Sequence, residues 1–324
     1  MEEVADIGEL LEGGACDAGA AYVRAGRGTT APNLGAWQPP AWAAEALERV
    51  GRLCRLFVNQ TALIMPGRQT QGQPCARVEP PAGAELLTLP AGGETVGALF
   101  GPALAEDGAP LPAAEARSRP TLLFFYGNRM CLGVTAHLFQ HLRRLGANVL
   151  VPDYVGFGLS TGRASEAGCY ATADAAWRHL LSRDDVDPSL IVAGGVSLGG
   201  AVAVNLAARV PVAGLVTLVT FTSIPDMARH LYPDVPIWRF IRHKFDSLSK
   251  MPSVTCPALI GYSTGDSLVP QWMADRLATA CRGPVTRLVI KGADHRTAEM
   301  LEVGGDVIFG AIGRFLEDLA PAAA

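Results

Sequence analysis

Short apolar runs alternate with longer stretches of helical spacing over the last two thirds of the chain. The runs, bounded by turn residues, predict strands at 121–126, 148–151, 190–193, 215–220, 258–262 and 287–290. Helices are predicted at 135–145, 171–182, 198–209 and 271–280, with a last one from about 306 to 319. Alternation of this kind is typical of an α/β fold with a mostly parallel, doubly wound sheet.

The first third of the chain has a different pattern. Residues 1–35 are rich in Gly and Ala without periodicity and predict a loosely ordered tail, followed by a single domain over 36–324. Apolar residues at helical spacing over 42–57 predict an amphipathic helix. Its polar face carries both charge signs, which favours packing on the domain over a membrane surface. Runs at 85–89 and 95–100 predict antiparallel strands, and 104–120 predicts a loop.

Composition narrows the class of protein. The chain has 324 residues, 49% of them hydrophobic, which suits a large buried core. A net charge of −4 argues against nucleic-acid binding. No run of apolar residues is long enough to span a membrane, and the start of the chain lacks a secretory signal pattern. Seven cysteines without CxxC spacing predict reduced thiols and a cytoplasmic location.

The sequence GVSLG at 195–199 carries the first chemical signal. It follows an apolar run and precedes a small-residue helical stretch, which predicts a sharp strand-to-helix turn. Such a turn holds the Ser197 hydroxyl at the helix N-terminus, and the flanking glycines leave space where a Cβ would collide with neighbours. Ser197 is therefore the candidate nucleophile.

Serine at neutral pH needs an imidazole to accept its proton, and the imidazole needs a carboxylate to fix its tautomer. Asp266 follows the predicted strand 258–262, and His295 follows the strand ending at residue 290. The order Ser, Asp, His is the order expected for an α/β hydrolase. Asp294 is adjacent to His295 and cannot easily reach its ring Nδ1, so Asp226 is the second choice for the acid.

Backbone donors for an oxyanion are expected at two places. The strand 121–126 leads into Gly127 and Asn128, and we assign one N–H to Asn128. The other comes from Leu198, directly after the nucleophile. The Asn128 side chain is not required for this role and is free to brace the loop.

Five segments then resemble a known family. They are YGN at 126–128, DYVGFGLSTG at 153–162, GVSLGG at 195–200, FTSI at 221–224 and GDSLVP at 265–270. Together they resemble a small-capped branch of the α/β-hydrolase superfamily with a His-Gly-Asn oxyanion loop, which includes some protein depalmitoylases. The resemblance implies hydrolysis through an acyl-enzyme by Ser197, Asp266 and His295, without a metal or organic cofactor.

The chain departs from that branch at several positions. Tyr126 stands where the family has His, Val196 replaces an Arg, and Tyr262 and Ser263 replace a His-Gly pair. None of these changes removes a triad group. The N-terminus lacks a cysteine cluster that could be lipidated, which weakens the likeness to the depalmitoylases.

An insertion over 221–252 predicts a minimal cap of one or two helices. If its apolar residues face the cleft, they favour an apolar acyl group, with Tyr126, Met130 and Phe157 as expected substrate-binding residues. The predicted function is hydrolysis of esters or thioesters of short-to-medium acyl chains, with a small-molecule substrate. An amidase or peptidase and a non-catalytic binding protein on the same fold stay open. His137 and His141 have metal-pair spacing but no obvious third ligand, so a packing role is favoured.

Overall fold

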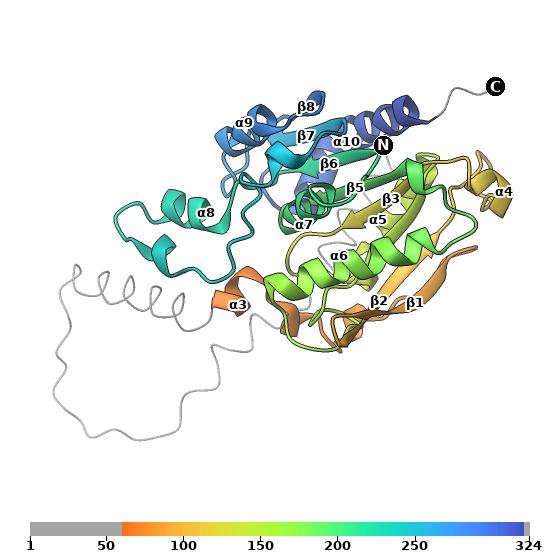
Figure 1. Cartoon of the computed structure of the whole chain (residues 1–324), viewed down its shortest axis with the longest axis horizontal. Coiled ribbons are helices and arrows are strands. Elements are labelled where there is room, and N and C mark those ends of the chain that lie inside the picture. Colours follow the sequence, from red (N-terminus) through yellow and green to blue (C-terminus); the bar gives the residue numbers. More distant parts are fainter. Residues whose placement is uncertain (1–59, 321–324) are drawn as a thin grey trace, which may run out of the picture.

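The computed structural model describes residues 60–320 and shows one eight-stranded sheet (Figure 1). The strand order is β1-β2-β4-β3-β5-β6-β7-β8. The strands are β1 Glu85–Ala91, β2 Glu94–Gly101, β3 Thr121–Phe125, β4 Asn148–Pro152, β5 Ile191–Val196, β6 Gly214–Leu218, β7 Ala258–Ser263 and β8 Val285–Ile290. The β1–β2 and β2–β4 pairs are antiparallel and the remaining pairs are parallel. The structure confirms the predicted α/β fold with antiparallel N-terminal strands.

The direction of each crossover places the helices on two faces of the sheet. The main helices are α5 Leu132–Arg144, α6 Glu166–Leu181, α7 Leu198–Ala207, α9 Gln271–Ala280 and α10 Thr297–Leu319. The β3–β4 and β4–β5 connections run in opposite directions along the sheet, so right-handed crossovers put α5 and α6 on opposite faces. His141 of α5 stacks on Phe309 of α10, with ring centroids 5.2 Å apart, so these two helices share a face. Figure 1 shows α6 and α7 on the near side of the sheet.

Shorter helices complete the described chain. They are α3 Gln60–Ile64, α4 Ala113–Ala116 and α8 Ile224–Leu231, with 3-10 turns η2 Gly67–Gln69, η3 Pro74–Ala76, η4 Pro188–Leu190, η5 Ile237–Phe240 and η6 Met251–Ser253. The insertion over 221–252 therefore holds one α-helix and one complete 3-10 turn, η5. The segment 104–120, predicted as a loop, contains the single turn α4.

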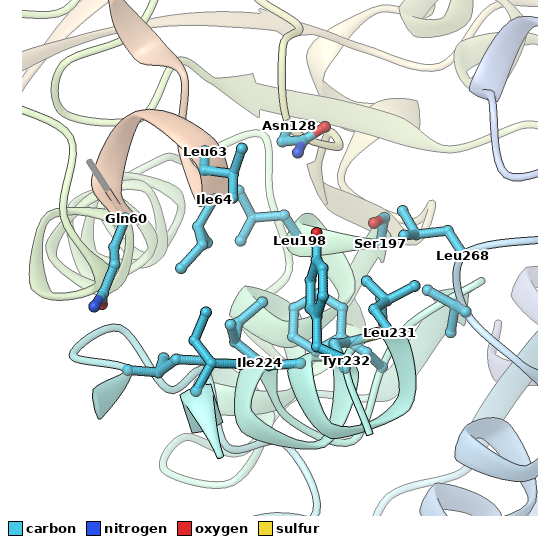
Figure 2. Close-up of a pocket in the computed structure, with 16 residues that line it drawn as sticks. Gln60, Leu63, Ile64, Asn128, Ser197, Leu198, Ile224, Leu231, Tyr232 and Leu268 are labelled. Carbon is cyan, nitrogen blue, oxygen red and sulfur yellow. The ribbon is translucent and has the colours of Figure 1, made fainter. Parts of the chain in front are cut away.

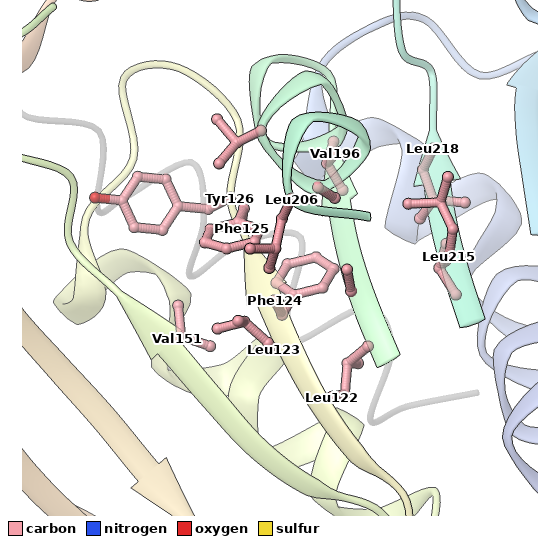
Figure 3. Packing of buried hydrophobic residues seen from close by; sticks show 14 of the residues in the cluster. Leu122, Leu123, Phe124, Phe125, Tyr126, Val151, Val196, Leu206, Leu215 and Leu218 are labelled. Carbon is pink, nitrogen blue, oxygen red and sulfur yellow. The ribbon is translucent and has the colours of Figure 1, made fainter. Parts of the chain in front are cut away.

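The core lies between the central strands and the helices that cover them. Every residue of β3, β4, β5 and β6 is buried, as expected for strands covered on both faces. Figure 3 shows Phe124 of β3 and Leu206 of α7 packed beside β5. Leu215 and Leu218 lie on the neighbouring strand, β6. A rigid core of this kind fixes the carboxyl ends of the strands, where the site is built.

Two helices begin five or more residues earlier than the sequence pattern predicts. Helix α6 begins at Glu166 because Ser165 caps it, its side chain accepting a hydrogen bond from the Gly168 N–H. Helix α10 begins at Thr297 and passes through Gly304, where a Cβ would lie 2.6 Å from Ile290 Cγ2. The absence of a side chain at Gly304 permits close packing of the helix on β8.

Further predictions concern the N-terminal residues, the cysteines and membrane-spanning segments. The tail over 1–35 and the helix over 42–57 lie outside the described residues. Cys75 is disulfide-bonded, so the expectation of reduced cysteines is wrong at this position, whereas Cys131, Cys169, Cys256 and Cys281 carry free thiols. The thiol argument for a cytoplasmic location is weakened accordingly. Between residues 60 and 320, none of the helices combines the length and apolarity needed to cross a bilayer.

Candidate active site

The turn between β5 and α7 holds Ser197 in a strained conformation. Its backbone has φ +52° and ψ −113°, a region that side-chain-bearing residues rarely occupy. Glycines on both sides permit this turn: a Cβ on Gly195 would lie 2.3 Å from the Gly199 carbonyl carbon, and one on Gly199 would lie 1.9 Å from the Phe125 oxygen. The local sequence thus forces the serine out of the strand and places it above the helix.

Gly199→Ala is expected to destabilise the fold by about 3 kcal/mol or more, because its Cβ meets backbone atoms that cannot move independently. Urea unfolding monitored by circular dichroism measures this loss. Gly310→Ala is the matched control, because a Cβ there has only the flexible Arg314 guanidinium nearby, at 3.5 Å, inside α10. That variant is expected to gain up to about 1 kcal/mol. Equal stability for the two variants would contradict the close-packing argument.

Three side chains from three loops form one hydrogen-bonded chain. Ser197 Oγ lies 2.9 Å from His295 Nε2, and His295 Nδ1 lies 2.8 Å from Asp266 Oδ2. Ser197 follows β5, Asp266 follows β7 and His295 follows β8, so the carboxyl ends of three parallel strands bring them together. The Asp266 side chain is fully buried, while 17% of the His295 side chain is exposed.

The hydrogen bonds of Asp266 leave one oxygen for the imidazole. Its Oδ1 accepts from the N–H groups of Leu268 and Val269 at 2.9 and 2.7 Å, which fixes the carboxylate plane. The adjacent Asp294 instead joins two loops, since its Oδ1 accepts from the Ser267 N–H and hydroxyl and from the His295 N–H. The hydrogen bonds from Ser267 hold the pKa of Asp294 at about 2.

Asp226, the second candidate for the acid, serves a different part of the molecule. It lies in the first turn of α8, accepts a hydrogen bond from Thr222 and forms an ion pair with Arg229 at 2.8 Å. The geometry therefore favours Asp266 over Asp226 as the partner of His295.

The loop after β3 faces the nucleophile. Asn128 lines the same cavity as Ser197 and Leu198, and Arg129 has a left-handed φ of +62°. Within residues 60–320, the backbone N–H groups of Asn128 and Leu198 donate to no protein acceptor. Two such groups beside the serine hydroxyl can stabilise negative charge that develops on a substrate oxygen.

A buried carboxylate holds both ends of that loop. Asp153, which is fully buried, accepts from the Tyr126 hydroxyl at 2.8 Å, from the Leu132 N–H at 2.9 Å and from the Leu159 N–H at 2.7 Å. The Tyr154 hydroxyl donates to the Tyr126 carbonyl at 2.7 Å. The residues on either side of the segment 127–131 are thus tied to one point, so Tyr126 braces the loop from within the core.

The titration of Asp153 makes stability depend on pH. Burial raises its pKa to about 6 against three opposing hydrogen bonds, above the value of ~3.9 for an unfolded chain. Between these values the native state retains a proton that the unfolded state has lost, so stability falls as pH rises from about 4 to about 6. The expected loss is about 2–3 kcal/mol.

Urea unfolding across that pH range tests this expectation by comparing wild type with Asp153→Asn, which does not titrate. The free energy of unfolding of wild type minus that of the variant is expected to decrease as pH rises. A difference that stays constant with pH would show that the three donors balance burial, and one that increases with pH would show that they outweigh it; either would contradict the expectation.

An apolar cavity opens beside Ser197. Its volume is about 200 Å³. Figure 2 shows it between α3 on one side and α8 on the other, with Ser197 at one end. The lining residues are Gln60, Leu63, Ile64, Asn128, Ser197, Leu198, Phe221, Ile224, Met227, Ala228, Leu231, Tyr232, Ile237, Ile241, Leu268 and Val269. The structure thus gathers the apolar residues of the insertion around the candidate nucleophile.

The expected substrate-binding residues are not among those that line the cavity. Tyr126 and Phe157 have no exposed surface, and Met130 is 8% exposed. Tyr126 turns its hydroxyl to Asp153, and its ring lies 6.5 Å from that of Phe157, so both belong to the core beneath the loop. Their assignment to the substrate is corrected: proximity in sequence to Asn128 does not place a side chain in the cleft.

Helix α3 supplies cavity residues that sequence reasoning missed. Gln60, Leu63 and Ile64 come from a segment far from the rest of the site in the sequence. The stretch has no chemical motif. Its apolar residues give only a general signal for burial, so their role depends on the tertiary structure.

Comparison with known proteins agrees with this architecture. Residues 120–240 match the sequence model of the α/β-hydrolase fold. An uncharacterised protein of Mycobacterium tuberculosis is 37% identical over 209 residues, which are 64% of this chain and 74% of that protein. The chain belongs to the α/β-hydrolase family. The α/β-hydrolase domain-containing protein 17B of Xenopus laevis is 33% identical over 181 residues, which are 56% of this chain and 62% of that protein.

Solved α/β hydrolases share the fold at low sequence identity. Est1E from Butyrivibrio proteoclasticus superposes with a TM-score of 0.56 and 16% identity, over 72% of this chain and 98% of its own. The likeness at this identity concerns the fold. Membership of the α/β-hydrolase family and this fold support hydrolysis as the class of reaction.

Proposed function

We propose that this α/β hydrolase cleaves carboxylic esters or thioesters of short-to-medium acyl chains through an acyl-enzyme on Ser197. The observation that carries the proposal is the continuous hydrogen-bonded chain from Ser197 through His295 to Asp266, opening into an apolar cavity. Hydrolysis of an acyl bond needs a nucleophile, a proton acceptor and a place for the acyl group, and these residues supply all three.

The proposed mechanism has two halves. His295 Nε2 takes the proton of Ser197 as Oγ attacks the carbonyl carbon, and Asp266 stabilises the imidazolium through Nδ1–H. The carbonyl oxygen becomes negative and accepts hydrogen bonds from the N–H groups of Asn128 and Leu198. The intermediate collapses, and His295 gives its proton to the departing alcohol or thiol. Water, deprotonated by His295, then releases the acid from Ser197.

The cavity supports an acyl group of limited length. Its wall from Leu198 to the cap is apolar, so burying hydrocarbon there is favourable by about 0.8 kcal/mol per methylene. An apolar cavity of ~150 Å³ accommodates benzene, so about 200 Å³ suits an acyl chain of roughly six to eight carbons. Esters with such chains are the substrates with which to begin.

Turnover of p-nitrophenyl esters of graded chain length tests the proposal, beside the matching p-nitroanilides as amides. We expect ester turnover that peaks near the chain length the cavity holds and disappears in Ser197→Ala. Faster turnover of the anilides would favour an amidase. A folded wild-type protein with no turnover of any ester would favour a binding protein on a hydrolase fold.

A further inference from the structure

One polar side chain lies in the wall of the apolar cavity. Gln60, the first residue of α3, is 8% exposed and lines the cavity among aliphatic and aromatic residues. Its amide is bound to the cap at both ends: Nε2 donates to the Phe240 carbonyl at 2.9 Å, and Oε1 accepts from the Arg242 N–H at 3.0 Å. The two bonds fix the amide plane of Gln60 relative to the cap.

Gln60 lies far from the nucleophile within the cavity. Figure 2 shows Ser197 and Gln60 at opposite ends, with Leu198 and Ile64 between them. Leu63, Leu231 and Leu268 line the cavity and are 51%, 42% and 36% exposed, which marks them as the mouth. At the other end Gln60 itself is buried, with 8% of its surface exposed.

A second contact fastens the same part of α3. Thr61 Oγ1 lies 2.9 Å from His243 Nε2, directly after the cap segment that holds Gln60. Neighbouring residues of α3 are thus joined to neighbouring residues of the insertion, although about 180 positions separate them in the sequence. Helix α3 and the cap form one wall, and Gln60 closes it.

We propose that Gln60 is the residue that limits acyl-chain length, as a stop at the end of the cavity held by its two hydrogen bonds to the cap. The inference rests on the proposed function for the identity of the occupant, an acyl chain. A chain that grows past the stop must displace the amide and so break its two partly buried hydrogen bonds, with the Phe240 carbonyl and the Arg242 N–H. That loss offsets what one or two further methylenes gain.

Two substitutions separate the volume of Gln60 from its hydrogen bonds. Gln60→Ala removes the stop and opens space, whereas Gln60→Leu fills a similar volume without hydrogen bonds. Gln69→Ala is the control, because Gln69 is an exposed glutamine in η2 that does not line this cavity. All three are made in the Ser197→Ala protein, so that binding is measured without turnover.

Calorimetric titration with saturated carboxylic acids of about four to about fourteen carbons gives the binding profile. In the protein that carries Ser197→Ala alone, affinity for the acids is expected to rise about fourfold per methylene and then level off once the cavity is filled. In Gln60→Ala the rise is expected to continue for about two more methylenes, a gain of roughly fifteenfold for the longer acids. Gln60→Leu fills the volume but can be displaced without breaking these hydrogen bonds, so it is expected to bind the longer acids with an affinity between those of the parent protein and Gln60→Ala. Gln69→Ala is expected to keep the original limit.

The outcomes separate this inference from the proposed function. A profile whose limit stays in place in Gln60→Ala, or acids that bind without any dependence on length, would overturn the role of Gln60. Absence of ester turnover in wild type, together with a shifted limit in Gln60→Ala, would overturn the proposed reaction and leave the role of Gln60 standing. Ester turnover in wild type, together with a chain-length limit that is unchanged in Gln60→Ala, would support the proposed reaction and overturn the role of Gln60.

Discussion

Ser197→Ala is expected to lower ester turnover by at least about 10⁴-fold while leaving the fold intact. The substitution removes only the hydroxyl group of Ser197, whose oxygen Oγ takes part in the 2.9 Å hydrogen bond to His295. Without the nucleophile the acyl-enzyme cannot form, and what remains is stabilisation by the oxyanion donors and by binding. Steady-state kinetics with the best p-nitrophenyl ester measures the loss, with circular dichroism as the check on folding.

His295→Ala is expected to cost about as much as Ser197→Ala, and the double variant little more than either. Groups that act as one unit give strongly non-additive losses. A double variant whose loss is the product of the two single losses would indicate that the two residues act independently. That result would contradict a shared role for the hydrogen-bonded pair.

Asp266→Asn is expected to lower kcat by about 10⁴-fold with little change in KM. The amide can present its NH₂ group to His295 Nδ1, which leaves the proton on Nε2, and Nε2 is then unable to accept from Ser197. The two backbone donors on Oδ1, from Leu268 and Val269, favour this orientation because they need an oxygen acceptor. The kinetics of the purified variant test the prediction.

Asp226→Asn is the matched control for the acid. Asp226 holds Thr222 and Arg229 in the cap, so its loss is expected to leave kcat close to the wild-type value. A large loss of kcat in Asp226→Asn with near-normal kcat in Asp266→Asn would exchange the two assignments.

The parts of the fold and site that the sequence predicts well are those set by local rules. The strand-to-helix turn at Ser197 needs glycines at 195 and 199, and the structure shows backbone atoms within 2.5 Å of the position where each Cβ would lie. Asp266 and His295 follow successive strand ends, and parallel strands bring such ends to one edge of the sheet. Chain order and periodicity were sufficient for both.

The lining of the cavity could not be predicted in the same way. Tyr126 and Phe157 flank the site in sequence, but their rings pack inward around Asp153, which needs the Tyr126 hydroxyl as a donor. Gln60 and Leu63 belong to a segment without a motif, and only the tertiary contacts with the cap bring them to the cavity. Positions fixed by long-range packing leave no periodic signal in one sequence.

Labelling with a fluorophosphonate probe, followed by peptide mass mapping, tests the central claim most directly. The phosphorus forms a covalent bond only to an activated serine and fluoride leaves, so the reaction reports the Ser197–His295 pair without assuming a substrate. We predict one modified peptide, containing Ser197, and loss of labelling in His295→Ala. A folded wild-type protein that stays unlabelled, or that is labelled at another serine, would contradict the account.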